Sequence, residues 1–176
     1  LGTGAGLGNQ GGVVLTESGR ELLVVNAGSD NVSSFRIRSN GSLELIGTYP
    51  SGGVRPISVT ESRGIVYVLN AGGAGGITGF TMKNGALSMI PGSTRPLCGA
   101  GVGPAQVQFA RKGSVLVVTE KGSNSLDTYT VNAKGVASGP STFASSGATP
   151  FGFGVANGLV VVSEAFGGAT DASALS

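Results

Sequence analysis

The chain has 176 residues, of which only 11% are charged, 33 are glycine and none is histidine, and it is long enough for one domain with a sizeable core. Its 11 basic and 9 acidic residues are scattered and leave a net charge of +2, so no basic stripe marks a nucleic-acid-binding surface. No apolar run approaches the roughly 20 residues that a membrane-spanning helix needs. Abundant valine, many glycines and the lack of helix-forming runs predict an all-β protein with many turns.

A unit of strand, turn and strand occupies residues 21–37 and recurs along the chain. Residues 22–25 are an apolar run, 26–31 have turn chemistry, and 32–37 alternate between polar and apolar side chains. Further copies occupy 65–82, 115–131 and 159–176, the last reaching Ser176 as its second strand should be forming.

Three landmarks repeat with a period of about 46 residues. They are a polar residue after the apolar strand (Asn26, Asn70, Glu120, Glu164), an aromatic residue (Phe35, Phe80, Tyr129) and a proline (Pro56, Pro104, Pro150). Short strands with such a period are typical of β-propellers, in which each blade is a four-stranded antiparallel sheet. The sequence therefore predicts a single partial propeller domain, 1–176, with blades near 10–50, 55–92, 104–145 and 150–176, the last incomplete.

The predicted strands follow one another in four groups. In chain order they are 12–16, 22–25, 32–37 and 43–48; 57–60, 65–69, 77–82 and 86–90; 105–110, 115–119, 126–131 and a weak strand near 141–144; and 151–155 and 159–163. Three and a half blades leave sheet edges unpaired, whereas a propeller needs closure. We therefore expect either a missing propeller half or a second copy of the chain to complete the ring.

The lengths of the connections predict the working face. Short hairpin turns join the first strand to the second and the third to the fourth, so they share one face of the meander. The longer connections lie on the opposite face, the long-loop face. The residues expected to converge there are Gln10, Asn26, Arg55, Asn70, Glu120 and Glu164.

Three stretches of the sequence resemble a known family. They are Val24 to Phe35, Tyr67 to Gly72 and the glycine-rich Gly2 to Gly11. These stretches resemble the lactonase family of seven-bladed propellers, which contains 6-phosphogluconolactonase and the fungal carboxy-cis,cis-muconate lactonising enzyme. Surface-layer and quinoprotein-like propellers share the repeat, but the glycine-rich stretch and the segment from Thr119 to Tyr129 favour the lactonase branch. The resemblance spans nearly the whole chain, as the N-terminal half of such a propeller, and implies about three and a half of seven blades.

The resemblance implies an enzyme that opens or forms a lactone on a small carboxylated or phosphorylated substrate. The muconate cyclase branch is understood to use a histidine together with glutamate and arginine, and this chain has no histidine. Three explanations stay open: the histidine belongs to the missing half, the chemistry differs, or there is no chemistry. The alternative function is a non-catalytic propeller, secreted or on a cell surface, that binds a protein or carbohydrate partner.

Glu120 and Glu164 are the predicted catalytic residues. They occupy the position that Asn26 and Asn70 hold in the first two blades, and a carboxylate there can accept a proton, bind a cation or pair with arginine. Alternatively, both glutamates cap strand ends and pair with a nearby cation such as Lys121. An enzyme predicts that the two line one pocket close to an arginine. A binding scaffold predicts that they sit apart and exposed, beside apolar groups such as Phe166.

Six further residues are predicted to bind substrate. Arg55 and Arg95 offer planar guanidinium groups that grip a carboxylate or a phosphate in a bidentate manner. The other four are amides, namely Gln10, Asn26, Asn70 and Gln108. The asparagines equally well hydrogen bond their own turns, and Gln108 equally well faces channel water.

No cofactor or metal site is predicted from the sequence. Gly2 to Gly8 superficially suggests a dinucleotide loop, but no strand precedes it and no helix follows. Cys98 is the single cysteine and has no histidine to activate it, so we interpret it as a loop or half-buried thiol. Among metals only an oxygen-ligand site for calcium or magnesium is conceivable. The sequence leaves the compartment open between secreted and cytoplasmic.

Overall fold

The computed structural model describes residue 3, residues 6–165 and the backbone of residues 171–175. Within these ranges the only helical segment is a single 3₁₀ turn, η1 (Arg111–Gly113). No helix in the described part of the chain has the length and apolar character to cross a bilayer. The rest of the regular structure is β-strand.

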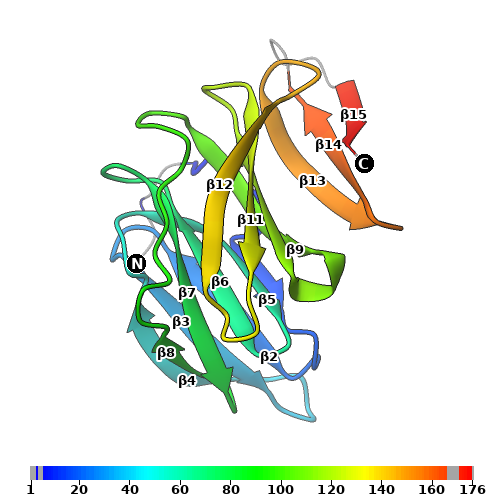
Figure 1. Ribbon diagram of the computed structural model, residues 1–176. Coiled ribbons are helices and arrows are strands. Elements are labelled where there is room, and N and C mark those ends of the chain that lie inside the picture. Colours follow the sequence, from blue (N-terminus) through cyan, green and yellow to red (C-terminus); the bar gives the residue numbers. More distant parts are fainter. Residues whose placement is uncertain (1–2, 4–5, 166–170, 176) are drawn as a thin grey trace.

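The described residues form fifteen strands in four antiparallel sheets, and the strands of each sheet follow one another in chain order (Figure 1). The first sheet contains β1 (Val13–Leu15), β2 (Glu21–Asn26), β3 (Asn31–Ile37) and β4 (Leu43–Pro50). The second contains β5 (Pro56–Ser62), β6 (Ile65–Asn70), β7 (Gly76–Lys83) and β8 (Ala86–Met89). The third contains β9 (Pro104–Ala110), β10 (Val115–Glu120), β11 (Ser125–Val131) and β12 (Ala137–Ala144). The fourth has three strands, β13 (Pro150–Ala156), β14 (Leu159–Glu164) and β15 (Asp171–Leu175).

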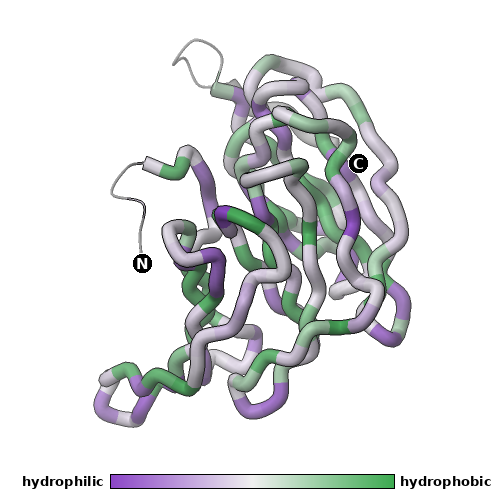
Figure 2. The backbone as a smooth tube through the Cα atoms, turned by 90° about the vertical axis from the view of Figure 1, so that its left-hand side faces the viewer, coloured by the Kyte–Doolittle hydropathy of each residue, from purple (hydrophilic) through white to green (hydrophobic). Residues whose placement is uncertain are grey.

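The sheets pack face to face as blades, with their first strands next to one another. Strand β5 contacts β9, and β9 contacts β13, so the first strands are the inner strands of the arrangement. Figure 2 shows hydrophobic residues along the strands and hydrophilic residues gathered in the turns. Because successive side chains on a strand point to opposite faces, and the second and third sheets have a neighbouring sheet on each side, both faces of these two sheets are buried.

The largest cluster of buried apolar side chains lies between the second and third sheets. It includes Tyr67, Leu69, Phe109, Leu116 and Tyr129. The rings of Tyr67 and Phe109 meet edge to face, with centroids 6.0 Å apart, which is a favoured aromatic geometry. The Tyr67 hydroxyl donates to the carbonyl of Gly135 and accepts from the N–H of Ala137, so this buried polar atom is satisfied.

The predicted all-β fold of four-stranded antiparallel blades is confirmed. Each predicted strand is present, most with bounds that differ by one or two residues. The weak strand predicted near 141–144 begins earlier, at Ala137, because β12 lies at the sheet edge and tolerates Pro140 there. The segment after Glu164 forms the third strand of the last sheet, so that sheet is more complete than the sequence indicated.

Apolar side chains remain exposed on the two outermost blades. Leu15 and Leu45 of the first sheet are 54% and 56% exposed, and Val161 of the fourth sheet is 44% exposed. An apolar hollow of about 520 Å³ lies where the third and fourth sheets meet, lined in part by Val117, Phe143 and Val160. A closed ring of blades would cover such surfaces.

Candidate functional site

The last residue of the second strand is polar in every sheet, and we call these four positions the slots. They are Asn26, Asn70, Glu120 and Glu164. All four begin the connection to the third strand, on the long-loop face. Their side chains differ in charge and in hydrogen-bond partners.

In the second sheet, the slot residue anchors the connection from the preceding blade. The Asn70 side chain is buried and its Nδ2 donates to the carbonyl of Ser51 at 3.3 Å. It packs so closely on Gly53 that a Cβ added there would lie 2.6 Å from the amide carbon. In the first sheet, Asn26 instead donates to Asn31 and Ser33 within its own hairpin, at 2.7 and 2.9 Å.

Glu164 anchors the connection between the third and fourth sheets in the same way. Its Oε1 accepts hydrogen bonds from Ser145 Oγ at 2.6 Å and from the N–H of Gly147 at 2.7 Å. The side chain is buried. These bonds are those of a loop anchor, so the geometry supports the strand-end alternative for Glu164, while the catalytic role stays a prediction.

Glu120 is completely buried and lies in a different environment. Its Oε2 accepts from Cys98 Sγ at 2.7 Å, from Ser123 Oγ at 2.9 Å and from Ser125 Oγ at 3.1 Å. Its Oε1 has no hydrogen-bond partner among the described residues. A buried carboxylate oxygen without a donor is costly, so this atom requires a physical explanation.

A second buried carboxylate, Asp127, lies beside Glu120. Asp127 Oδ1 accepts from Thr142 Oγ1 at 2.6 Å, and the Tyr129 hydroxyl lies 3.4 Å from Oδ2. One potential ligand atom from each of Cys98, Glu120 and Asp127 lies within 4.8 Å of the others, and we call these three residues the acid cluster. Sequence reasoning missed it, because Cys98 belongs to a connection with no counterpart of equal length in the repeat.

The electrostatics of the acid cluster favour the protonated form of Glu120. Burial raises the pKa of the Glu120 carboxyl, and Asp127 raises it further, although the hydrogen bond from Cys98 lowers it. Burial also raises the pKa of the Cys98 thiol, as does its hydrogen bond to Glu120. Both salt bridges of the described residues lie elsewhere, from Arg36 and Arg38 to Glu44.

Arg55 lies with Lys121 in a second feature of the long-loop face, which we call the cationic pocket. This pocket has a volume of about 180 Å³, and both cations line it together with the backbone-rich segments 71–75 and 101–104. Burial lowers the pKa of Lys121, and the nearby positive charge of Arg55 lowers it further. The Lys121 ammonium donates to the carbonyl of Gly8 and lies 5.2 Å from the centre of the Phe151 ring.

No carboxylate lines the cationic pocket. The backbone around Arg55 is fixed: its N–H donates to Asp30 Oδ1 at 2.6 Å, and its φ of 55° lies in the left-handed region. Gly103 and Thr149 precede the corresponding prolines with similar φ angles of 60° and 62°. A backbone turn that recurs in three blades therefore presents an arginine in one blade only, where its charge and that of Lys121 share a pocket whose lining includes no carboxylate.

Two other predicted site residues lie outside the cationic pocket. The Arg95 guanidinium donates to the carbonyls of Gly92 and Thr94, at 2.9 and 2.6 Å, within its own loop. The backbone N–H of Gln10 donates to the carbonyl of Ala105. Its side chain lies next to Gly152, whose added Cβ would be 3.1 Å from Gln10 Cγ. Phe166 lies outside the described residues.

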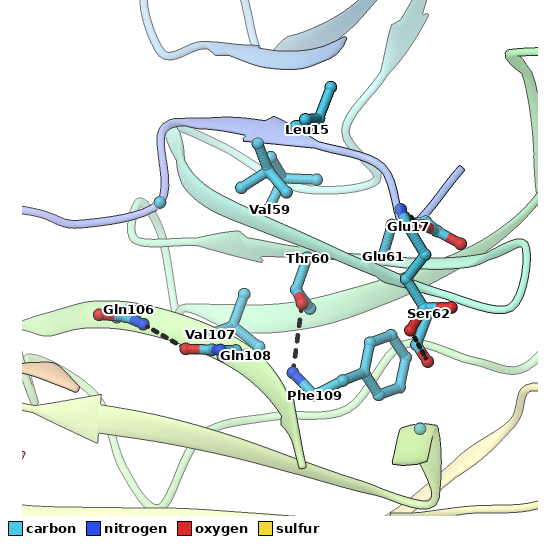
Figure 3. Close-up of a pocket in the computed structure, with 13 residues that line it drawn as sticks. Leu15, Glu17, Val59, Thr60, Glu61, Ser62, Gln106, Val107, Gln108 and Phe109 are labelled. Carbon is cyan, nitrogen blue, oxygen red and sulfur yellow. Dashed lines mark hydrogen bonds between the residues drawn. The ribbon is translucent and has the colours of Figure 1, made fainter. Parts of the chain in front are cut away.

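A third feature, the channel pocket, lies along the inner strands (Figure 3). Its volume is about 430 Å³. Gln108 lines it, as predicted from its place on the first strand of a blade, and accepts from Gln106 Nε2 at 2.9 Å. Gln106 also bonds both backbone groups of Phe153, which ties β9 to β13. Glu17 and Glu61 line the end at the short turns, where both accept backbone N–H donors.

The structure therefore brings together only part of the predicted site. Arg55 joins Lys121, which the sequence suggested only as a pairing partner for a glutamate. Glu120 and Glu164 line neither the cationic pocket nor the channel pocket, and each is bonded to a different inter-blade connection. The signal for Lys121 is its position after a slot, where the other three blades carry alanine.

Known protein structures contain the same arrangement of blades. Three solved structures share the fold. A protein from Lactobacillus plantarum is 22% identical with a TM-score of 0.71, over 88% of this chain and 47% of its own. The periplasmic gluconolactonase of Pseudomonas aeruginosa is 20% identical with a TM-score of 0.65, over 93% of this chain and 52% of its own. A candidate 6-phosphogluconolactonase from Bacteroides uniformis is 20% identical with a TM-score of 0.67, over 78% and 40%.

The chain thus spans about half the length of the solved structures that it matches. No protein with curated annotation matches it in sequence. The model of one family, described as lactonase, 7-bladed β-propeller, matches residues 13–165. That match covers most of the chain and includes all four slots. The chain belongs to the lactonase family of seven-bladed β-propellers.

Proposed function

We propose that this protein is a lactonase that hydrolyses a small lactone carrying a carboxylate or phosphate, and that the cationic pocket holds the anionic group. The observation that carries this proposal is the pairing of Arg55 and Lys121 in one pocket without a carboxylate. A partly desolvated lysine beside an arginine favours an anion between them, and arginine and lysine are the usual ligands of phosphate and carboxylate groups. Membership of the lactonase family supports the reaction type.

The reaction itself is simple acyl transfer to water. Water adds to the lactone carbonyl carbon, a tetrahedral oxyanion forms, and the ring C–O bond breaks to give a hydroxy acid. The cations of the pocket position the substrate by its anionic group, which lowers the entropic cost of reaching the reactive geometry. A base for the water remains to be assigned, and Glu120 and Glu164 are the residues that the sequence proposes for that role.

The experiment compares two lactones that differ in charge. Proton release is followed at constant pH as the protein opens 6-phosphogluconolactone or uncharged gluconolactone, with the spontaneous rate subtracted. We expect the protein to prefer the phosphorylated lactone, because only that substrate carries a phosphate for the pocket. Loss of one charged hydrogen-bonding partner should raise KM for it by about tenfold, which corresponds to about 1.4 kcal/mol.

The internal repeat supplies the variants. Arg55→Gly and Lys121→Ala introduce the residues that other blades carry at the same positions, so both should fold normally. Arg63→Gly is the matched control, because Arg63 also has a positive φ, 53°, but lies in a short turn on the opposite face. Equal rates on the two lactones, or a KM unchanged by Lys121→Ala, would contradict the role of the cationic pocket.

The second candidate is a non-catalytic propeller that binds a partner. The anchoring bonds of Glu164 favour it, because they occupy a predicted catalytic group with loop contacts. A protein that binds phosphorylated sugars but leaves the spontaneous rate of lactone opening unchanged would support this candidate. Glu164→Gln separates the two further, since a catalytic base requires the carboxylate whereas an anchor retains most of its contacts.

We also propose that further blades complete the ring around this chain. The exposed apolar side chains of the first and fourth sheets and the greater length of the solved relatives support this proposal. The intact mass of the purified polypeptide, compared with its mass in solution, tests it. A polypeptide near twice the 17.2 kDa of this chain supports additional blades, whereas a dimer of 17.2 kDa chains means that a second copy closes the ring.

A further inference from the structure

The acid cluster is the part of the molecule that the proposed function leaves unexplained. Two completely buried carboxylates, Glu120 and Asp127, lie side by side, and the Cys98 thiol contacts one of them at 2.7 Å. No lysine or arginine forms a salt bridge with either carboxylate among the described residues. Burying adjacent carboxylates without a cation is unfavourable unless a proton or a metal ion neutralises them.

One oxygen of the Glu120 carboxylate marks the place where a proton or a cation would neutralise the negative charge. Glu120 Oε1 is buried and accepts no hydrogen bond from the described residues. The slot oxygen of Asn70 also has no partner, but it belongs to a neutral amide, so within the described part of the chain only the third blade buries an unpartnered oxygen of an ionisable group. All hydrogen-bond donors to this carboxylate converge on Oε2. The adjacent Asp127 carboxylate is itself an acceptor, so it can serve Oε1 only when one of the two groups carries a proton.

The internal repeat shows that only the third blade combines a glutamate in the slot with an aspartate at the third residue of the third strand and a cysteine in the connection. The fourth blade shares the glutamate, Glu164, but neither of the other two. The slot residue is neutral in the first and second sheets, where Asn26 and Asn70 replace Glu120. Strand register aligns Asp127 with a hydroxyl residue in each of the other sheets, namely Ser33, Thr78 and Ser173. The inter-blade connections contact the second slot through the backbone carbonyl of Ser51, the fourth through the hydroxyl of Ser145 and the third through the thiol of Cys98.

Each of these three differences introduces a side chain that can bind a metal ion. The third blade replaces the neutral amide of the first two slots and the hydroxyl residue of the third strand by carboxylates, and its connection adds a thiol. Carboxylates and thiols are metal ligands when deprotonated. A thiol together with oxygen ligands suits a borderline cation such as Zn²⁺ better than Ca²⁺ or Mg²⁺, which select oxygen alone. Cys98 is exposed, so the cation has a path from solvent and the thiol has room to reorient.

We propose that Cys98, Glu120 and Asp127 bind a divalent cation of the zinc type, with a water in the remaining position. The site ties the connection before the third blade to that blade, so the bound ion stabilises the long-loop face. The site is independent of the cationic pocket, because the Glu120 and Lys121 side chains have separate partners. It also differs from the oxygen-ligand site that the sequence left conceivable, since it uses the cysteine.

The test begins with chelator-treated protein titrated with Zn²⁺ in a calorimeter. We expect one equivalent to bind and the thermal unfolding midpoint to rise with metal concentration, because the ion binds only the folded site. Titration with Co²⁺ should give the absorption band of a cobalt–thiolate bond. Binding of Ca²⁺ in preference to Zn²⁺, or no binding of Zn²⁺, would overturn the proposal and leave a shared proton as the neutralising group.

Variants separate ligation from folding. Cys98→Ser introduces the residue that the neighbouring connections use and should fold, yet it should abolish the cobalt–thiolate band and weaken Zn²⁺ binding by at least about tenfold. Asp127→Asn keeps the shape of the side chain and should have a similar effect on affinity. Glu164→Gln is the matched control, since it removes a buried slot carboxylate outside the cluster, and Zn²⁺ affinity should not change. An affinity unchanged by Cys98→Ser would contradict the assignment.

Discussion

In the second and third blades the connection after the slot starts with the same backbone hydrogen bond but with different dipeptides. The second has Asn70-Ala71 and the third has Glu120-Lys121. The backbone is equivalent, because the N–H of Ala71 donates to the carbonyl of Arg55 and the N–H of Lys121 donates to the carbonyl of Gly103, at 2.9 and 3.0 Å. Neutral groups anchor a loop in the second blade, whereas the third adds a buried acid and a surface cation at one point of the scaffold.

Substitution at equivalent strand ends therefore gives two blades of one repeat different chemical groups. Successive residues of an extended strand point to opposite faces, so one dipeptide reaches two separate environments. Glu120 points to the acid cluster, and Lys121 points to the cationic pocket. The second blade keeps only the anchor, and it therefore shows what the third blade needs for folding alone.

Replacing Glu120 and Asn70 by alanine should give the largest difference in stability between the two blades. Glu120→Ala removes the acceptor of three hydrogen bonds and leaves a cavity in a fully buried site, so we expect the free energy of unfolding to fall by about 3 kcal/mol. Asn70→Ala removes one bond of 3.3 Å and should cost about 1 kcal/mol. Urea unfolding of both variants measures the difference, and equal losses would mean that the two slots are equivalent anchors.

Placing a carboxylate in the neutral slot should have the next largest effect. In Asn70→Asp an acceptor replaces the amide that donates to the carbonyl of Ser51, so ionisation becomes unfavourable in the folded state. The introduced acid then has a higher pKa in the folded than in the unfolded protein. The loss of stability should therefore be about 2 kcal/mol at pH 8 and should vanish as the pH falls below the unfolded pKa near 4. A loss that is independent of pH would contradict the charge argument.

We expect anion binding to depend on pH because the pKa of Lys121 is lowered. Because burial and Arg55 lower the pKa of Lys121, its charge is lost at a lower pH than that of an ordinary lysine. Affinity for 6-phosphogluconate should therefore decline as the pH rises towards 10, and the decline should move to higher pH in Lys121→Arg. Calorimetric titrations between pH 7 and about 10 measure both curves. Identical curves would exclude Lys121 as a ligand.

Neutralising the buried acid should have the smallest effect on stability. Glu120→Gln keeps the shape of the side chain and removes a group whose ionisation is disfavoured by burial. In metal-free protein we expect a change below about 1 kcal/mol at pH 5 and a modest gain relative to wild type at pH 8, since only the glutamate must ionise there. Thermal unfolding in the presence of a chelator measures the change. A large loss at pH 8 would mean that the folded protein requires the carboxylate.

The sequence predicted the blades because hydrophobic runs, prolines and turn residues all repeat with one period. The places of Gln108 on the first strand of the third blade and of Arg55 just before the first strand of the second follow from the predicted strands, whereas their roles stay predictions. The sequence did not predict the partners of Glu120. Cys98, which contacts Glu120, lies in the connection 92–103, and no other connection between the described blades is as long. The pocket that joins Arg55 to Lys121 was missed for a related reason: it brings together connections from different blades.

The most direct test of the account is the affinity for 6-phosphogluconate, the ring-opened anion, in the wild type and in Lys121→Ala. The variant carries in the third blade the alanine that follows the slots of the other three. We expect the affinity to fall by about tenfold and the unfolding midpoint to fall only slightly, because the variant removes an anion ligand but only one exposed hydrogen bond, to Gly8, and one contact with the Phe151 ring. An unchanged affinity would contradict the claim that this position in the third blade makes the binding site.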